Sequence, residues 1–214
     1  MQIFCFIVAS ILLIFGWLSP FHTYPWVTFS SELASFGAAF AVVTLFLTKE
    51  IKIPRPQIFM LGIVLLPLLQ FCFGLILDFS VAFLSFTYLF TFWLMMLCGY
   101  NLSLQAENRE KLMIGFSLLV LVAGLLSSFI AIVQWLNLES YLYGIMGLRG
   151  NRPYANFGQP NNLSTFLVMG LMGGLYLYEK SKASPWLLIP SSLILLFTIT
   201  LTQSRTAWIV CIFF

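Results

Sequence analysis

The sequence predicts an all-α protein that crosses a membrane several times, with seven complete transmembrane helices and the start of an eighth. Of its 214 residues, 61% are hydrophobic and only 8% are charged, whereas soluble domains have about 45–50% apolar and about 25% charged residues. The apolar stretches run for about 20 residues, which is the length of a helix across a bilayer and about twice that of a barrel strand. Because so apolar a chain could not cover a water-facing surface, we expect its solvent to be lipid.

The predicted elements follow one another along a single transmembrane domain, residues 1–214. The first span is uncharged and lacks the basic start and cleavage site of a signal peptide, so we expect it to be retained. Pro67 predicts a kink in the third span, and Asp78 predicts the turn before the fourth. The seven complete spans are predicted at residues 1–21, 33–48, 56–77, 79–100, 112–134, 163–178 and 185–201.

The eighth predicted span, residues 206–214, is too short to cross a bilayer. At about 1.5 Å per residue it reaches about 13–14 Å into an apolar core about 30 Å thick. We therefore expect this sequence to be a truncated product or a fragment of a larger membrane protein.

The basic residues are divided unequally between the two sides of the predicted helices. Loops on one side carry seven of the ten Lys and Arg residues, including all five lysines, whereas loops on the other side carry only Arg149, Arg152 and Arg205. Loops rich in Lys and Arg generally stay in the cytoplasm. This distribution predicts a cytoplasmic N-terminus and places the three remaining arginines outside.

The longest polar interruption lies in the predicted external loop 135–162, which ends in RGNRPYANFGQPNN. Forked guanidinium donors match phosphate oxygens, and helix N-termini attract anions through their free N–H groups. Two of the external arginines precede the sixth predicted helix and one precedes the eighth, so these two helix ends could form a pyrophosphate cradle, with the amides binding sugar hydroxyls. The predicted substrate-binding residues are Arg149, Arg152, Asn156, Gly158, Gln159, Pro160, Asn161 and Arg205.

The residue types alone leave simpler explanations open. Interfacial arginines also bind lipid head groups, and Asn, Gly and Pro also make turns and caps. His22 and Trp26 lie in a stretch typical of an aromatic membrane interface, and the alternative is a place at an acceptor entrance. Glu32 either marks the interface or pairs with an arginine. The sequence has no Gly-rich phosphate loop, zinc-ligand spacing or Ser/His/Asp set.

Three segments together resemble bacterial protein O-oligosaccharyltransferases, the PglL-like pilin glycosylation ligases of the O-antigen ligase and Wzy polymerase superfamily. The first, PFHTYPW at residues 20–26 with the later Glu32, is similar to the first external loop of the protein-glycosylating branch. The second is the polar segment 149–162. The third, LTQSRTA at residues 201–207, is similar to the Ser-Arg element of the superfamily.

The resemblance implies a glycosyltransferase of the bacterial inner membrane. Such an enzyme moves a preassembled glycan from an undecaprenyl-pyrophosphate carrier to Ser or Thr of a periplasmic protein such as pilin, surrounded by membrane lipids and without nucleic acid, cofactor or metal. Its essential histidine lies in a large periplasmic loop, which we expect downstream of Phe214. The resemblance therefore implies that the fragment alone contains no catalytic residue and is inactive.

Two other functions remain open at this point. An O-antigen ligase or polymerase would transfer to a glycan, but residues 22–26 favour the branch with a protein acceptor. A transporter or lipid-binding protein would be expected to carry ionisable groups inside its spans. The predicted spans have almost none, which counts against ion or proton coupling.

Overall fold

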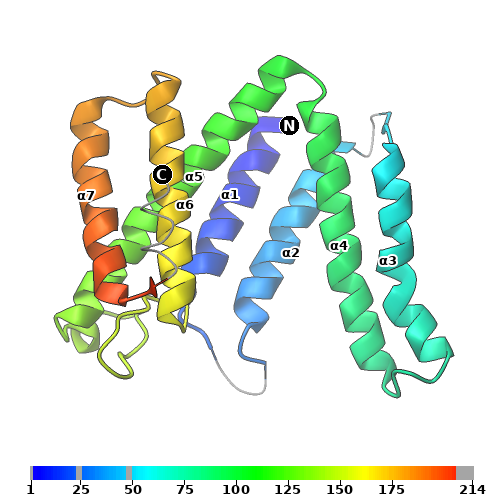
Figure 1. Cartoon of the computed structure of the whole chain (residues 1–214), viewed down its shortest axis with the longest axis horizontal. Coiled ribbons are helices and arrows are strands. Elements are labelled where there is room, and N and C mark those ends of the chain that lie inside the picture. The colour runs from blue at the N-terminus through cyan, green and yellow to red at the C-terminus, as the bar shows by residue number, and fades with distance from the viewer. Residues whose placement is uncertain (1, 23–25, 47–49, 206–214) are drawn as a thin grey trace. The chain divides into compact units, whose positions relative to one another are not determined.

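A computed structural model describes residues 2–22, 26–46 and 50–205 (Figure 1). These residues form α-helices, two short 3-10 helices and no β-strand, which confirms the predicted all-α class. The elements are α1 (Gln2–Leu18), α2 (Phe29–Val43), η1 (Thr44–Phe46), α3 (Arg55–Cys72), α4 (Phe79–Ser103), α5 (Ala106–Trp135), η2 (Glu139–Tyr141), α6 (Pro160–Glu179) and α7 (Pro185–Thr202).

The helices pack in two units. The first takes residues 2–9 and 35–109, and in it α3 and α4 lie side by side (Figure 1). The indole of Trp93 on α4 donates a hydrogen bond of 2.8 Å to the Gln57 carbonyl on α3. The second unit takes residues 10–34 and 110–205 and contains most of α5, all of α6 and α7, and the polar loop that joins α5 to α6.

Local chemistry explains several helix boundaries. Asp78 caps α4 by accepting a hydrogen bond of 2.8 Å from the N–H of Ser80, as its predicted turn role requires. Pro160 and Pro185 occupy the first turns of α6 and α7, where a missing N–H costs nothing. Gln203 ends α7 in the left-handed conformation, with φ of 51°.

Five of the described helices are long and apolar enough to cross a membrane, so the chain is a multi-pass membrane protein. The five candidate spans are Phe29–Phe46, Arg55–Cys72, Phe79–Ser103, Ala106–Trp135 and Pro185–Thr202.

The count of seven complete spans is confirmed only in part. The first and sixth predicted spans form α1 and α6, but α1 has 17 residues, one fewer than the shortest candidate span, and Asn161 and Asn162 lower the hydropathy of the first turn of α6. The third span ends at Cys72, earlier than predicted, because the chain turns at Gly74 with φ of 70°. The predicted eighth span, residues 206–214, lies outside the described residues.

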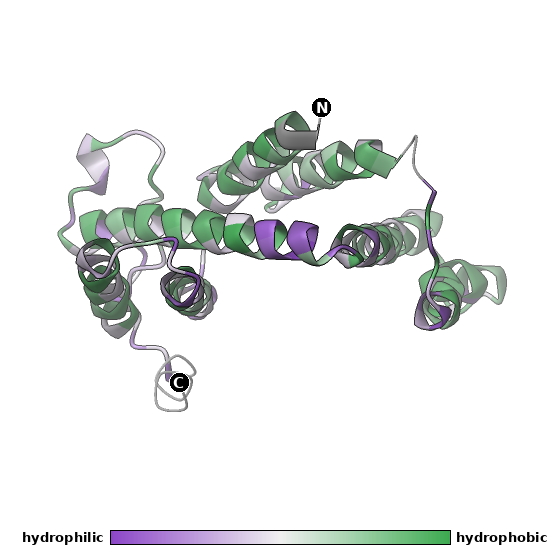
Figure 2. Cartoon of the chain, turned by 90° about the horizontal axis from the view of Figure 1, so that it is seen from above, coloured by the Kyte–Doolittle hydropathy of each residue, from purple (hydrophilic) through white to green (hydrophobic). Residues whose placement is uncertain are grey.

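The interior of the second unit is apolar and tightly packed. Leu163 and Leu167 of α6 and Leu195 and Ile199 of α7 are each at most 2% exposed. Many large apolar side chains instead lie on the outside of the helices, as lipid-facing residues do. Figure 2 shows hydrophilic residues of α5 gathered at its N-terminal end, with hydrophobic turns after them.

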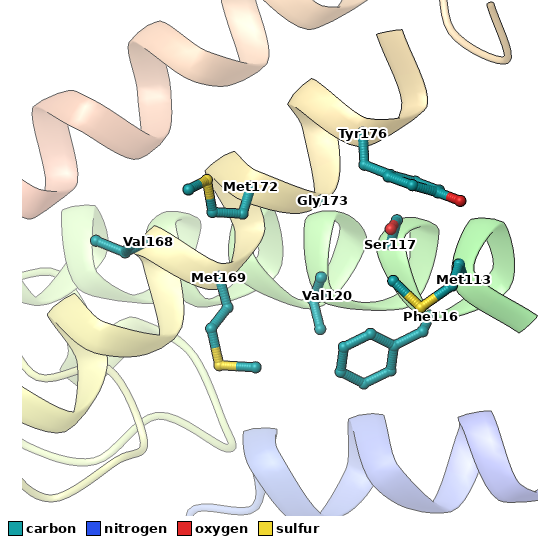
Figure 3. Close-up of a pocket in the computed structure, with 9 residues that line it drawn as sticks. All are labelled: Met113, Phe116, Ser117, Val120, Val168, Met169, Met172, Gly173 and Tyr176. Carbon is teal, nitrogen blue, oxygen red and sulfur yellow. The ribbon is translucent and has the colours of Figure 1, made fainter. Parts of the chain in front are cut away.

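A glycine contact sets the spacing between α5 and α6. A Cβ on Gly173 would lie 2.6 Å from the carbonyl oxygen of Ser117 and 2.8 Å from Cγ2 of Val120, so only glycine fits this close approach. Beside the contact lies an apolar groove of about 420 Å³, which Figure 3 shows between the two helices. Met113 and Phe116 of α5 and Met169 and Tyr176 of α6 contribute to its walls.

We predict that Gly173→Ala lowers the free energy of unfolding by about 1–3 kcal/mol, because the new methyl group overlaps backbone that cannot move freely. The measurement is the thermal unfolding of the protein in detergent. Gly174→Ala is the matched control, since its Cβ would meet Leu121 and Leu188 at 3.7 Å, an ordinary contact distance. Equal melting temperatures of the two variants would contradict the proposed helix contact.

Candidate ligand-binding site

The polar loop between α5 and α6 is built around Gln134, a side chain in the last turn of α5 that is 0% exposed. Its Oε1 accepts hydrogen bonds from the N–H groups of Tyr154, at 3.1 Å, and Ala155, at 2.8 Å. Its Nε2 donates to the carbonyl oxygens of Met146, at 2.9 Å, and Ala155, at 2.7 Å. One amide therefore satisfies four backbone groups that would otherwise be buried without partners.

Asn156, a predicted ligand-binding residue, is 2% exposed and serves the same loop. Its Nδ2 donates to the carbonyl oxygens of Leu18, at 2.6 Å, and Gly144, at 2.9 Å. Its Oδ1 accepts from the N–H of Met146 at 3.1 Å. The geometry thus assigns this amide to internal contacts, and the exposed polar residues of the loop are the ones that can reach a ligand.

Tyr154 closes the turn that carries the arginines. Its hydroxyl donates to the carbonyl of Gly147 at 2.6 Å and accepts from the backbone N–H of Arg149 at 3.2 Å. The residue is 4% exposed, so its ring also packs in the interior. Neither Tyr154 nor Gln134 was predicted as a site residue. The available signal was a polar side chain at the end of an apolar span, where an unpaired amide is costly.

Arg152 connects the loop to the end of α7. Its Nε donates to the carbonyl of Thr202 at 2.7 Å, and one terminal nitrogen donates to Oδ1 of Asn161 at 3.3 Å. Thr202 is the last residue of α7, where carbonyl groups lack helical partners and the helix dipole is negative. Arg205, which is exposed, follows three residues later. The Arg152 contact therefore ties the predicted Ser-Arg segment to the loop.

A cleft of about 310 Å³, lined in part by Arg149 and Arg152, lies over this turn. Arg149 and Asn151 on its rim are exposed, and Pro160, at the start of α6, lines it as well. No carboxylate is among the lining residues. Its lining consists of Met146, Arg149, Gly150, Asn151, Arg152, Tyr154, Gly158 and Pro160.

The start of α6 adds two exposed predicted residues. Gln159, the N-cap of the helix, is extended and makes no side-chain capping bond. Asn161 is exposed and holds Arg152 through its amide oxygen. Free N–H groups in the first turn of a helix favour anions. Of the eight predicted substrate-binding residues, four line the cleft, two flank it, Asn156 lies in the interior and Arg205 follows α7.

The stretch after α1, which contains His22, lies against the polar loop of residues 135–162, called the motif loop below. A Cβ placed on Gly158 would be 3.8 Å from Cδ2 of His22 and 4.0 Å from its Nε2. Nδ1 of this imidazole is buried and has no hydrogen-bond partner among the described residues. Phe166 of α6 packs on both Trp17, at 5.0 Å, and Phe157, at 4.9 Å between ring centroids. The end of α1 with the residues after it, and the motif loop with α6, therefore pack against each other although they are far apart in sequence.

Trp26 and Glu32 lie near the start of α2. Trp26 is 45% exposed and meets Phe29 edge to face, with ring centroids 5.6 Å apart. Glu32 accepts a hydrogen bond from the hydroxyl of Thr28 one turn earlier, and its other carboxylate oxygen is buried without a partner among the described residues. The Trp26 geometry suits the interfacial interpretation, in which an amphipathic ring sits between lipid and water.

Comparison with known proteins shows what this part of the chain is similar to. The family model of a protein glycosylation ligase matches residues 153–178, which cover the end of the motif loop (residues 135–162) and almost all of α6. The general O-oligosaccharyltransferase of Acinetobacter baylyi (strain ATCC 33305 / BD413 / ADP1) is 48% identical over 214 residues. The match covers 100% of this chain and 38% of that protein.

A second relative comes from the same organism. The ComP-specific O-oligosaccharyltransferase is 30% identical over 161 residues, which cover 75% of this chain and 29% of the relative. The chain thus spans less than two fifths of the length of either relative. No solved structure matches the chain.

We predict that Gly158→Ala loosens the motif loop, because Gly158 has φ of 69° and a left-handed conformation costs other residues about 1–2 kcal/mol. Hydrogen exchange of the loop amides should accelerate about fivefold or more, since about 1 kcal/mol is a factor of about five. Gly158→Asn should show a smaller effect because Asn tolerates this conformation better. Gly147→Ala is the control, as nothing lies within 4 Å of its Cβ position. Equal exchange in all variants would refute the assigned conformation.

Proposed function

Because the chain is a homologue of the PglL-family O-oligosaccharyltransferases along its whole length, we propose that it takes part in O-linked protein glycosylation. The reaction transfers a preassembled glycan from an undecaprenyl-pyrophosphate carrier to a Ser or Thr hydroxyl of a periplasmic protein such as pilin. The residues described here supply the site for the pyrophosphate end of the donor. Relatives extend well beyond the matched region, so this activity is proposed for the whole protein.

The single observation that carries the proposal is the cationic cleft without a carboxylate. Arg149 and Arg152 contribute two permanent positive charges to a volume of about 310 Å³ at the start of α6. Guanidinium groups bind phosphate oxygens through paired donors, and a helix N-terminus adds further N–H donors. A diphosphate linked to a sugar has the charge and the hydrogen-bonding groups that such a cleft selects.

The chemistry follows from the leaving group. The acceptor hydroxyl oxygen attacks the anomeric carbon, the bond from this carbon to the pyrophosphate oxygen breaks, and a base takes the hydroxyl proton. Negative charge grows on the departing pyrophosphate, so fixed cations that face it stabilise the transition state more than the ground state. Arg149 and Arg152 have this role in the proposal, and Arg205 joins them from beyond the end of α7.

The acceptor enters, in this proposal, beside the stretch that follows α1. His22 lies against Gly158 of the motif loop, and Trp26 is exposed nearby in sequence. These residues shape the entrance, and His22 lies next to Gly158, which also lines the arginine cleft. Exposed aromatic rings suit a peptide or protein acceptor, since they offer apolar area with few rotamers to fix.

A glycan-accepting O-antigen ligase or polymerase is the nearest alternative. Both named relatives are O-oligosaccharyltransferases, and one is specific for ComP, which favours a protein acceptor for this chain as well. A transporter is less consistent with the structure. Charged residues of the described helices lie near helix ends, so these spans offer no Asp, Glu, Lys or Arg at mid-membrane.

The location proposed is the bacterial inner membrane, with the N-terminus in the cytoplasm and the motif loop in the periplasm. The charge distribution supports this orientation, because Lys49 and Lys52 follow α2, Lys111 lies near the start of α5, and Lys180 and Lys182 follow α6. The orientation also places the cleft on the side where a periplasmic acceptor would be found.

We predict that Arg152→Ala and Arg205→Ala each reduce glycosylation of the acceptor by at least about 100-fold in the full-length protein, because each removes a cation that faces the leaving group. Arg152→Lys should retain part of the activity, since it keeps the charge but not the fork. Acceptor modification is followed by its mobility shift in cells that lack the native enzyme. Lys180→Ala, at the opposite end of α6, is the control for expression and insertion. Full activity of both alanine variants would refute the cleft.

We also predict the orientation of the chain. A reporter fused after Lys182 should be active only as a cytoplasmic fusion, and one inserted between Gly150 and Asn151 only as a periplasmic fusion, since the lysine-rich loops stay inside. Paired alkaline phosphatase and fluorescent protein fusions measure this directly. The reverse pattern would place the cleft in the cytoplasm and would exclude a periplasmic acceptor.

A further inference from the structure

We propose that Gln134 is a positioning residue for the pyrophosphate donor: its buried amide holds both ends of the arginine-bearing turn, so that the cleft exists before a ligand arrives. This inference rests on the proposed function, because it concerns the same cleft. It goes further in assigning donor affinity to a side chain that is 0% exposed and cannot touch the donor.

The argument begins with how the turn is attached. Residues 147–153 contain Arg149 and Arg152, and the residues at either side of this segment, Met146 and Tyr154, both bond to Gln134. The turn is therefore a closed loop of backbone whose two ends meet on one side chain. Inside it, the Tyr154 hydroxyl bridges the Gly147 carbonyl and the Arg149 N–H.

A second amide reinforces the closure without replacing it. Asn156 accepts from the Met146 N–H, so Met146 is held through its N–H by one amide and through its carbonyl by the other. Ala155 likewise gives both its N–H and its carbonyl to Gln134. Its φ of 50° is left-handed, a conformation that a residue other than glycine adopts only where its surroundings impose it. Gln134 forms hydrogen bonds with both backbone groups of this strained residue.

Preorganisation is what this arrangement contributes to binding. A flexible loop would have to be ordered when the anion arrives, and the ordering cost would reduce affinity. A turn that buried hydrogen bonds hold in one conformation is ordered during folding, so the ordering cost does not reduce the affinity for the anion. Removing the amide would leave buried N–H and C=O groups unpaired, so the turn would leave its present conformation and the two arginines would no longer line one cleft.

A purely structural role for Gln134 is the competing explanation, and the experiment separates the two. The purified 214-residue chain in detergent is titrated with inorganic pyrophosphate, and hydrogen exchange is measured on the same samples. Gln134→Met keeps the length of the side chain and removes all of its hydrogen bonds. Ser128→Ala is the matched control, since Ser128 is equally buried on α5 and its hydroxyl has no partner among the described residues.

We expect Gln134→Met to weaken pyrophosphate binding at least tenfold and to accelerate exchange at Tyr154 and Ala155. The amides of α6 and α7 should stay as protected as in the wild type and in Ser128→Ala. In the full-length enzyme the same change should raise KM for the lipid donor and leave KM for the acceptor unchanged. A general loss of protection, with an unchanged pyrophosphate affinity in the folded fraction, would overturn the inference.

The remaining outcomes are also decisive. If Gln134→Met fails to insert, Gln134→Glu decides, because it keeps the acceptor oxygen for Tyr154 and Ala155 but loses the two donations to carbonyl groups. It should bind pyrophosphate with intermediate affinity, and wild-type affinity would overturn the inference. If the wild-type chain itself does not bind pyrophosphate, the proposed function of the cleft fails, whereas equal binding by wild type and Gln134→Met contradicts only the role of Gln134.

Discussion

The pairing of buried backbone groups in the α5–α6 loop is the constraint on which the rest of the site depends. Two side-chain amides meet this requirement, with four hydrogen bonds from Gln134 and three from Asn156. A buried polar group left without a partner costs about 1–3 kcal/mol. An irregular segment at the end of an apolar helix has few ways to avoid that cost, so its conformation is strongly specified. The conformation of this segment determines where Arg149 and Arg152 lie.

The positive charge of Arg152 has two roles in this arrangement. Arg152 neutralises the negative end of α7 by binding the Thr202 carbonyl, and the same guanidinium group lines the cleft. A cation held by a neutral carbonyl keeps its full charge for a ligand, whereas a carboxylate partner would cancel it. The bond from Asn156 to Leu18 spans 138 residues, and His22, which follows α1, lies against Gly158 of the same loop. One loop thus lines the arginine cleft and also contacts the stretch after α1.

Composition alone was sufficient for the class of fold, because a lipid environment requires long apolar helices with internally paired backbones. Helix ends with local chemistry were also predictable, as at Asp78, which caps α4. The third span was predicted too long, since residues 73–77 are apolar and hydropathy does not register the turn at Gly74. Hydropathy likewise does not decide whether α1 and α6 are complete spans, because both lie near the limit of length or apolarity.

At the site, the sequence by itself determined which residue types were present and in which loop: the arginines, the turn-forming residues and the amides of 149–162. Only the tertiary structure decided what each one does. Gln134, Asn156 and Asn161 carry the same functional group, but two are buried against backbone and one is exposed beside a cation. Side-chain amides donate and accept equally well in either setting. The difference lies in burial and in partners from distant segments, and these exist only once α1, α5, α6 and α7 have packed together.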